Sequence, residues 1–491
     1  MVFSSTVFLF IFLPLTLMAY YVLDRRFKNI ILLIASLVFY AWGEPRFVFV
    51  MLGSIMVNHA FAILIDKYRS CAEGEEGIFA ATAYRKKAKM LLCLMVIFNL
   101  SLFFVYKYLN FTIGNINAMT SLFGVRLLPQ TSIALPIGIS FFTFQAMSYV
   151  FDVYYRRGQV QKNPLNTMLY VCLFPQLIAG PIVRYETVAR EINSRKETLD
   201  DFAYGIRRFI CGLAKKVILS NSLALIADYA FNRADFTGLS VLMAWGGITA
   251  YTLQIFFDFS GYSDMAIGMG RMFGFHFEEN FNYPYISKSI SEFWRRWHIS
   301  LGSWFRDYVY IPLGGSRVGK MRQILNLFAV WFLTGVWHGA EWSFIVWGLF
   351  YFVLISFEKI TGLPKRLKNR GLCWGYQALT LLAIMLGWVV FRASNLSDGL
   401  RYIACMFGVM GNQLSDSGSV FMLTQGMPVL MLGVAFSIPV VPWLRKRLDG
   451  MQGWSAVASD VMIDVLYIAL FIISISFTVT STYNPFIYFN F

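Results

Sequence analysis

Charged side chains are scarce in this chain. They account for 14% of its 491 residues, whereas hydrophobic residues account for 57%. Many apolar runs approach the roughly 20 residues that a helix needs to span the hydrocarbon core of a bilayer. These runs are far longer than the strands of a membrane barrel, which have about ten residues. The sequence therefore predicts an all-α polytopic membrane protein and excludes an outer-membrane barrel.

Cysteine and histidine are also sparse, with six and four residues respectively. The cysteines form no Cys-x-x-Cys pair, and neither residue type has the spacing of a metal site. We therefore expect no metal and no bound cofactor. A Gly-x-Ser-x-Gly elbow, the mark of a hydrolase nucleophile, is absent as well. His59 and His276 have no distinctive sequence context, and we interpret them as structural.

Basic residues exceed acidic ones, and the net charge is +15. They fall between apolar spans rather than in one patch interleaved with stacking aromatics, so the charge indicates positive-inside loops and no nucleic-acid partner. Alternation of the loops then places the N-terminus outside. The first run, Val2 to Leu23, lacks a basic leader and a small-residue cleavage site, so we expect it to remain as the first span.

Reading the run 323–357 as two short spans predicts about 11 to 12 transmembrane helices. The segment 165–183 is interrupted by Pro175 and by Gly180-Pro181, and basic loops flank it on both sides. It is interpreted as a re-entrant segment beside an internal chamber. A Pro-kinked crossing is the alternative. The apolar runs cover residues 2–23, 27–42, 46–65, 90–106, 132–152, 204–230, 239–257, 323–357, 374–391, 426–442 and 459–479.

His338 lies inside the run 323–357. An ionisable residue within a membrane segment is costly, which indicates either a functional site or a hydrogen bond between helices. Basic residues precede and follow the run, so both of its ends belong on one side. At 1.5 Å per residue each half reaches only about 26 Å, which places the junction deep in the membrane or near its far face. Gly335 and Gly339 permit a bend or a close approach there.

Burial favours a neutral imidazole at His338, because a low-dielectric site disfavours the charged form. A neutral imidazole is able to accept a proton from a hydroxyl that attacks an electrophile. General-base catalysis of this kind typically contributes about 10²- to 10⁴-fold in rate. His338 is therefore a candidate catalytic base.

A second histidine belongs to a predicted helix that starts at Ser289. Ser289 and Glu292 have the spacing of a capping box. Trp294, Trp297 and His298 then recur at helical spacing and should share an aromatic face, together with Leu301, Trp304 and Phe305. Arg295, Arg296 and Arg306 point in other directions, as on an amphipathic helix at the cytoplasmic headgroup boundary. That membrane-surface role and a role in ligand binding both remain open for this helix.

A Gly-Gly turn with nearby cations follows this helix. Gly314, Gly315 and Arg317 come just before the helix that carries His338. Free amides at a helix start, with basic side chains nearby, suit a ligand that bears phosphate. Positive-inside charges after an ordinary turn would give the same pattern.

At these residues the chain resembles the membrane-bound O-acyltransferase (MBOAT) family, and within it the bacterial branch of alginate O-acetyltransferase-like proteins. The likeness runs from end to end, and the central block that contains both histidines is its most specific part. The matching segments are Met1 to Ser5, Phe39 to Trp42, Phe174 to Pro181, Asp258 to Asp264, Asn280 to Tyr285, Ser291 to Leu301, Tyr308 to Gly315, Thr334 to Ala340 and Pro485 to Phe489.

The resemblance implies one membrane domain over residues 1–491: a horseshoe of helices around a thin central floor and a channel. We expect N-terminal helices over 1–152, a core over 153–357 and C-terminal helices over 358–491. His338 matches the family's intramembrane catalytic histidine, and His298 matches its second histidine near the cytoplasmic mouth. The residues expected to contact the acyl donor are Trp294, Arg295, Arg296, Trp297, Gly314, Gly315 and Arg317.

By the same resemblance the reaction is acetyl transfer from a cytoplasmic donor, acetyl-CoA, for O-acetylation of an exported or cell-wall polysaccharide such as alginate. The expected location is the bacterial cytoplasmic (inner) membrane. Expected partners are membrane lipid and periplasmic or extracellular acetyltransferases that pass the acetyl group to the polymer. Two other functions stay open: a transporter of acyl groups or lipid-linked sugars, and a non-catalytic scaffold of a polysaccharide export complex.

Overall fold

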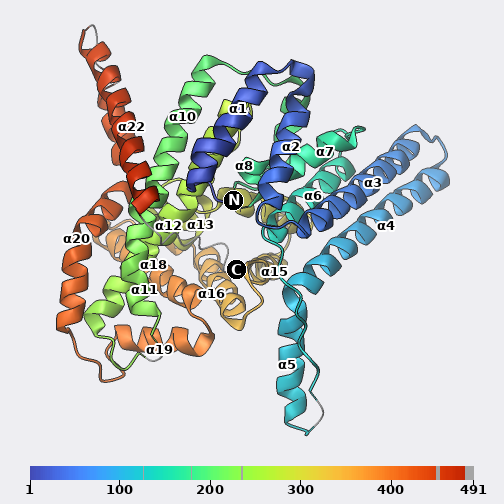
Figure 1. The fold of residues 1–491 in the computed structure, drawn as a ribbon. Helices are drawn as coiled ribbons and strands as arrows, with labels where there is room; N and C mark the ends of the chain where they lie inside the picture. The colour runs from blue at the N-terminus through green and yellow to red at the C-terminus, as the bar shows by residue number, and fades with distance from the viewer. Residues whose placement is uncertain (125–126, 179, 234–235, 449, 451–453, 481–491) are drawn as a thin grey trace. The chain divides into compact units, whose positions relative to one another are not determined.

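A computed structural model describes residues 1–124, 127–178, 180–233, 236–448, 450 and 454–480 (Figure 1). Helices dominate these ranges, and the isolated bridges found in them consist of one antiparallel pair, Phe281 with Trp297. The motif Pro485 to Phe489 and residue Ala179 of the motif Phe174 to Pro181 lie outside the described residues. The predicted all-α fold class is confirmed.

The helices up to residue 214 are α1 (Leu13–Val22), α2 (Lys28–Ala41), α3 (Phe47–Gly74), α4 (Ile78–Phe103), α5 (Leu109–Ser121), α6 (Ile139–Tyr154), α7 (Pro164–Cys172), α8 (Phe174–Leu177), α9 (Tyr185–Ser194) and α10 (Leu199–Ala214). Those that follow are α11 (Asn221–Phe231), α12 (Val241–Met272), α13 (Ile290–Arg296), α14 (Ile299–Phe305), α15 (Lys320–His338), α16 (Trp342–Thr361), α17 (Leu363–Arg366), α18 (Arg370–Arg392), α19 (Leu396–Met406), α20 (Ser417–Ser437), α21 (Val440–Leu448) and α22 (Trp454–Thr480). Short π-helical turns cover Phe8–Phe12, Phe104–Tyr108, Lys215–Ser220 and Arg306–Tyr310, and 3-10 turns cover Arg25–Phe27 and Pro284–Ile286.

Among the described residues, seven helical stretches are long and apolar enough to cross a membrane. The protein is therefore a multi-pass membrane protein. Other predicted runs also form helices, but some are shorter: α2 has 14 residues and α6 has 16. The seven stretches are Phe47–Gly74, Ile78–Ser121, Leu199–Phe231, Trp342–Thr361, Arg370–Arg392, Ser417–Ser437 and Val457–Thr480.

The chain divides into two compact units. The first unit is Met1–Gly205 with Met269–Glu278, and the second is Ile206–Gly268 with Glu279–Phe491. The predicted division after residue 152 falls inside α6, and the one after residue 357 falls inside α16. Neither is a boundary between the two units.

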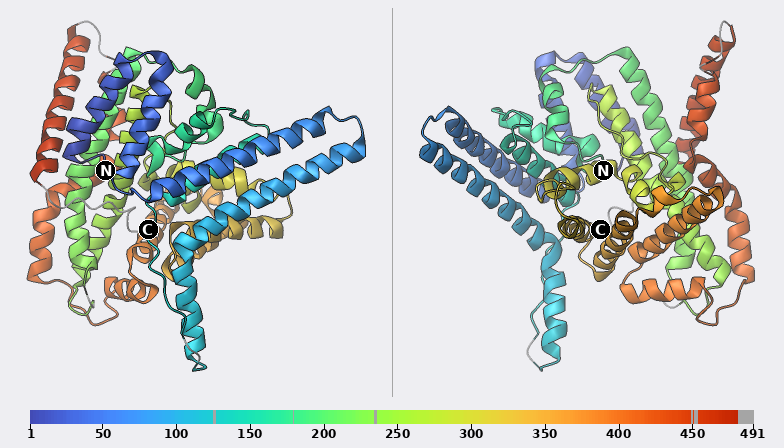
Figure 2. Two further views of the ribbon diagram at one scale, coloured as in Figure 1. Left: turned by 45° about the vertical axis from the view of Figure 1, so that its right-hand side comes forward. Right: turned by 180° about the vertical axis from the view of Figure 1, so that it is seen from behind.

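In the first unit, α3 and α4 form a long antiparallel hairpin, on which α6 also packs (Figure 2). The predicted interruption of segment 165–183 is confirmed. α7 ends at Cys172, Leu173 is not helical, and α8 is a single turn. At 1.5 Å per residue α7 is only about 14 Å long, too short to cross a bilayer.

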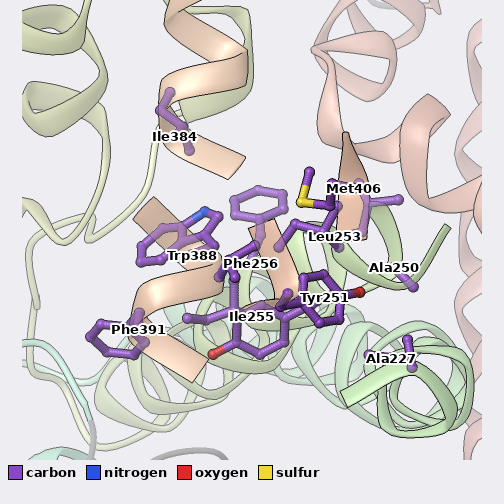
Figure 3. Close-up of a cluster of buried hydrophobic side chains, with 14 of the residues drawn as sticks. Ala227, Ala250, Tyr251, Leu253, Ile255, Phe256, Ile384, Trp388, Phe391 and Met406 are labelled. Atoms are coloured by element: carbon purple, nitrogen blue, oxygen red, sulfur yellow. The ribbon is translucent and has the colours of Figure 1, made fainter. Parts of the chain in front are cut away.

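In the second unit, an aromatic and aliphatic core joins α12 to α18. Figure 3 shows Trp388 and Phe391 of α18 in the same buried cluster as Tyr251 and Phe256 of α12. α12 is longer than expected. The sequence predicted a span over 239–257, but the helix continues to Met272.

The continuation of α12 carries Asp258 into the protein interior, where it is paired with Lys216. A buried charge is tolerated when it is paired and hydrogen-bonded. From the sequence, the polar residues after 257 were predicted to end the apolar helix. The pairing of Asp258 with Lys216 explains why the helix does not end there.

Candidate active site

His338 is the last residue of α15, at the bend of a helical hairpin. Gly339 follows it in an extended conformation, and α16 begins at Trp342. α15 and α16 pack closely against each other. The prediction that the run 323–357 consists of two arms is thus confirmed, and His338 lies at their junction.

Two glycines let the arms of this hairpin touch. A Cβ at Gly348 would lie 2.4 Å from the carbonyl oxygen of Trp331, and one at Gly335 would lie 2.6 Å from that of Phe344. Both contacts are with backbone, which has little room to yield. The close approach predicted for Gly335 is therefore real, and its partner on α16 is Gly348.

Aromatic rings surround His338. The ring centroids of Trp337, Trp347 and Phe391 lie 4.9, 5.0 and 5.1 Å from that of His338, and each ring is nearly perpendicular to the imidazole. His338 is only 7% exposed. The imidazole of His338 is therefore enclosed by aromatic rings on three sides.

His298 does not belong to a continuous helix, and here the sequence-based prediction was wrong. α13 ends at Arg296, Trp297 is extended, and His298 has a left-handed backbone with φ of 47°. The break comes from a segment distant in sequence. The Asn282 amide donates to the carbonyl of Arg296 at 2.9 Å, and the Ile299 amide donates to that of Asn280 at 3.0 Å.

Asn280 determines the tautomer of the neutral His298 ring, that is, which ring nitrogen carries the proton. Its Oδ1 accepts the backbone N–H of Ser300 at 3.1 Å, which fixes the orientation of the amide. The same oxygen lies 3.2 Å from Nδ1 of His298. Because this oxygen only accepts, the Nδ1 atom must donate. In the neutral ring the lone pair is then on Nε2, for which the described residues provide no hydrogen-bond partner.

His298 is buried, with 3% of its surface exposed, and it lies outside the seven candidate spans. Desolvation by burial lowers the pKa of its imidazole to about 3. Removal from water disfavours the charged form, and the Phe259 ring packs against this imidazole with a centroid distance of 4.6 Å. His298 is therefore neutral at physiological pH.

Trp337 lies next to both histidines. Its ring centroid is 6.0 Å from that of His298 and 4.9 Å from that of His338. The structure thus brings together the two residues that the sequence singled out as catalytic, although 40 positions separate them in the chain. The other two histidines belong to the first unit: His59 contacts Thr167, and His276 contacts Glu191.

Trp294 and Trp297 pack against other aromatic rings of the second unit. The Trp294 ring centroid is 4.9 Å from that of Trp331 and 5.4 Å from that of Trp347. Trp297 is buried, with its centroid 4.9 Å from that of Trp388. The two tryptophans extend the aromatic cluster around His338, because α13 packs against α16.

The two arginines of α13 differ in environment. Arg295 is exposed, whereas Arg296 pairs with Glu292, one turn earlier, at 2.8 Å. One of the two hydrogen bonds of the predicted capping box is present in this helix. Ser289 accepts the Glu292 amide at 3.1 Å, but Glu292 accepts the amide of Lys288 instead of that of Ser289.

The Gly-Gly turn does not offer the free amides that the sequence suggested. The amide of Gly314 donates to the carbonyl of Ile311 at 2.9 Å, and that of Gly315 donates to Tyr310 at 2.8 Å. The glycines serve the turn itself, since both have positive φ, 107° and 56°. Arg317 is exposed. This turn precedes the first residue of α15, and His338 is the last residue of that helix. The 19 residues of α15 span about 28 Å, so the turn and His338 are at opposite ends of it.

Glu358, a buried carboxylate near the end of α16, was not predicted from the sequence. It accepts the amide of Ile290 at 2.8 Å, the amide of Ser291 at 2.9 Å and the hydroxyl of Tyr376 at 2.8 Å. Glu358 therefore fixes the start of α13 to α16 and α18. A carboxylate near the end of an apolar helix could have indicated this role from the sequence, because a buried carboxylate needs hydrogen-bond partners.

Comparison with known proteins places this site in context. A sequence profile described as MBOAT, membrane-bound O-acyltransferase family, matches residues 82–369. Similar proteins include the probable alginate O-acetylase AlgI of Pseudomonas putida, 39% identical over 100% of both chains, and that of Azotobacter vinelandii, 40% identical over 100% of both. The peptidoglycan O-acetyltransferase of Helicobacter pylori is 32% identical over 100% of this chain and 98% of its own.

Proposed function

Because this chain belongs to the membrane-bound O-acyltransferase family, we propose that it transfers an acetyl group from cytoplasmic acetyl-CoA for the O-acetylation of an exported or cell-wall polysaccharide such as alginate. The protein is a multi-pass membrane O-acyltransferase. Names of similar proteins support a polysaccharide system, since they refer to alginate and to peptidoglycan. The proposed location is the bacterial inner membrane.

The observation that carries the proposal is the position of His338, at the bend of the α15–α16 hairpin and within a shell of aromatic rings. His338 takes the proton of an acceptor hydroxyl while the hydroxyl oxygen attacks the thioester carbonyl. A new C–O bond forms and the C–S bond breaks. The proton then passes to the leaving thiolate, so that free CoA is released. A positioned general base contributes about 10²- to 10⁴-fold to such a rate.

His298 positions the donor in this proposal. Its Nδ1 is committed to Asn280, and its Nε2 carries a lone pair inside the protein. That lone pair accepts a hydrogen bond, and the pantetheine arm of acetyl-CoA has amide N–H groups that donate one. The Trp337 ring next to both histidines supports a donor that passes His298 before its acetyl group meets His338.

The donor enters from the basic side of the second unit, around residues 286–322. The exposed cations Arg295 and Arg317 attract the phosphates of CoA, and Arg296 follows Arg295 on α13. Trp294 and Trp297 line the inner part of the path, where an apolar wall excludes water from the thioester. Gly314 and Gly315 shape the turn that presents Arg317.

The proposed partners are acetyltransferases on the outer side of the membrane. They receive the acetyl group and place it on the polymer, so the direct acceptor is a hydroxyl of the partner protein or of the polysaccharide. Membrane lipid surrounds the spans. The donor is a substrate, and the proposal includes neither a metal nor a resident cofactor.

A reconstituted system tests this proposal. The protein is placed in vesicles with acetyl-CoA labelled in its acetyl group, and with a polysaccharide or partner hydroxyl on the far side. The proposal expects free CoA on the donor side and label bound covalently to the acceptor. Labelled acetyl groups or intact donor that cross without release of free CoA would instead indicate a transporter.

A further inference from the structure

A polar cavity in the first unit lies far in sequence from either catalytic candidate. Its volume is about 120 Å³. One water molecule needs roughly 10–15 Å³ on such a measure, so the cavity is large enough for a phosphate group with several waters. Its lining residues come from the segment before α2, the first turn of α2 and the end of α9: Arg25, Arg26, Lys28, Asn29, Ile192, Asn193, Arg195 and Glu197.

The charge of this lining is strongly unbalanced. Four cations stand against one carboxylate, Glu197, which lies 3.1 Å from Lys28. Asp24 is also near, 4.0 Å from Arg26, but it caps the Arg26 amide at 2.9 Å. Cations held together without enough counter-charges repel one another, and an anion relieves the repulsion.

Arg195 is the fixed cation of the cavity. Its side chain is 6% exposed, its Nε donates to the Tyr20 hydroxyl at 2.8 Å, and its Nη1 donates to Asn29 at 2.6 Å. Its Nη2 is a buried donor for which the described residues provide no hydrogen-bond acceptor. Arg25 reaches the carbonyl of Arg195 at 2.9 Å and so closes the wall. Arg195 and Lys28 thus form the fixed wall of the pocket, whereas Arg25 and Arg26 are exposed at its mouth.

The pocket lies at the turn between two apolar helices. The apolar stretch Phe8–Val22 precedes it and α2 follows it, and Figure 1 shows α1 and α2 side by side, joined by the short segment that carries Arg25 and Arg26. Apolar side chains next to this segment are exposed, among them Val22, Leu23 and Phe27. A free anion gains nothing from them, whereas a lipid covers them with its acyl chains.

We infer that this pocket binds the phosphate group of an anionic phospholipid, with Arg25, Arg26 and Arg195 around the phosphate and the acyl chains against Phe27 and its neighbours. Basic pockets on the cytoplasmic side of membrane helices recognise headgroups of this kind. Arginine suits the role because its planar fork donates two hydrogen bonds to phosphate oxygens. The site holds lipid at the edge of the first unit and takes no part in acyl transfer.

Native mass spectrometry of the full-length protein in detergent tests this inference, with phosphatidylglycerol, phosphatidylcholine and inorganic phosphate as probes. The test variant is Arg25→Gln/Arg26→Gln, which leaves the buried Arg195 intact. Its matched control is Lys86→Gln/Lys89→Gln, which removes two exposed charges from α4. We expect wild type and control to retain phosphatidylglycerol in preference to phosphatidylcholine, and the test variant to bind it roughly 5- to 30-fold more weakly.

Inorganic phosphate distinguishes the two sources of the phosphate group. Weak displacement of the bound lipid by phosphate assigns the pocket to phospholipid. Full displacement of the bound lipid by inorganic phosphate, with no such displacement in the test variant, would instead assign the pocket to the free anion and overturn the inference. Equal lipid binding by wild type, test variant and control would overturn the inference, provided that all three show the same melting temperature. If the double variant unfolds, the single variant Arg26→Gln takes its place. The Arg26 side chain is 91% exposed, so its replacement should not disturb folding.

Discussion

Oδ1 of Asn280 lies 3.2 Å from Nδ1 of His298 and so determines which nitrogen of that ring carries the proton. The chain supplies this acceptor from a segment 18 residues earlier. The Ser300 amide holds it in place at 3.1 Å. A hydrogen-bond pattern therefore prepares His298 as an acceptor at Nε2, before any ligand binds.

Replacement of Asn280 tests this role. Asn280→Ala removes the closer acceptor and leaves the Ser300 hydroxyl, 3.5 Å from Nδ1. Nδ1 and Nε2 then compete for the proton, so Nε2 does not always carry the lone pair. We expect KM for the acyl donor to rise roughly tenfold, the effect of losing one buried hydrogen bond of about 1–3 kcal/mol. Ser300→Ala is the matched control. It removes the hydroxyl that donates to Asn280 at 2.9 Å but keeps the backbone amide that orients it, so its KM should stay within about threefold of wild type.

The low pKa of His298 makes the stability of the protein depend on pH. In the folded state burial holds this pKa near 3, whereas in the unfolded chain it returns to about 6.5. As pH falls between these values the unfolded state binds the proton and the folded state does not, so stability falls. This group alone should cost about 2 kcal/mol between pH 7 and pH 5.

Thermal unfolding in detergent at pH 7 and pH 5 measures this effect. His298→Gln has no titrating group at the site, so its melting temperature should fall less than that of wild type over this range. Equal decreases in the two proteins would show that His298 is not held neutral by burial.

The crossing of α15 and α16 depends on the absence of a side chain at Gly348. Gly348→Ala places a Cβ 2.4 Å from the carbonyl oxygen of Trp331. We expect a loss of about 1–3 kcal/mol in stability, as for other overpacked cores, and reduced acyl transfer because His338 moves with the hairpin. Gly53→Ala on α3 is the control, since a Cβ there meets nothing within 4 Å. Its melting temperature and activity should match those of wild type.

Glu358 should be as important for stability as any residue of the aromatic cluster. Glu358→Ala leaves the amides of Ile290 and Ser291 and the hydroxyl of Tyr376 without their acceptor. Each buried group left unsatisfied costs about 1–3 kcal/mol. We expect a large fall in melting temperature, and a smaller one for Glu358→Gln, which keeps one acceptor oxygen. If the two variants melted together at the wild-type temperature, Glu358 would not hold α13.

The α15–α16 hairpin was predictable from sequence because its signals are local. Basic residues at both ends and a run too short for two full crossings predicted the bend, and Gly339 marked its place. The break at Trp297 and His298 was not predictable in this way. Helical spacing continues through it, and the hydrogen bonds that interrupt the helix come from Asn280 and Asn282.

A buried ion pair accounts for the length of α12. Lys216 and Asp258 stand 42 positions apart and pair inside the protein, which extends α12 beyond the predicted span. The sequence alone does not show that these two residues pair with each other. A lysine within one apolar run and an aspartate at the end of the next do indicate a pair, because each alone would be too costly in the membrane.

The most direct test of the central claim is the release of free CoA by His338→Gln, measured with labelled acetyl-CoA and an acceptor hydroxyl. The control is His276→Gln, a histidine of the first unit with a 41% exposed side chain. We predict that His338→Gln folds, melts near the wild-type temperature and turns over about 10²- to 10⁴-fold more slowly, whereas the control keeps the wild-type rate. Acyl transfer by folded His338→Gln at the wild-type rate would contradict the role of His338 as the base.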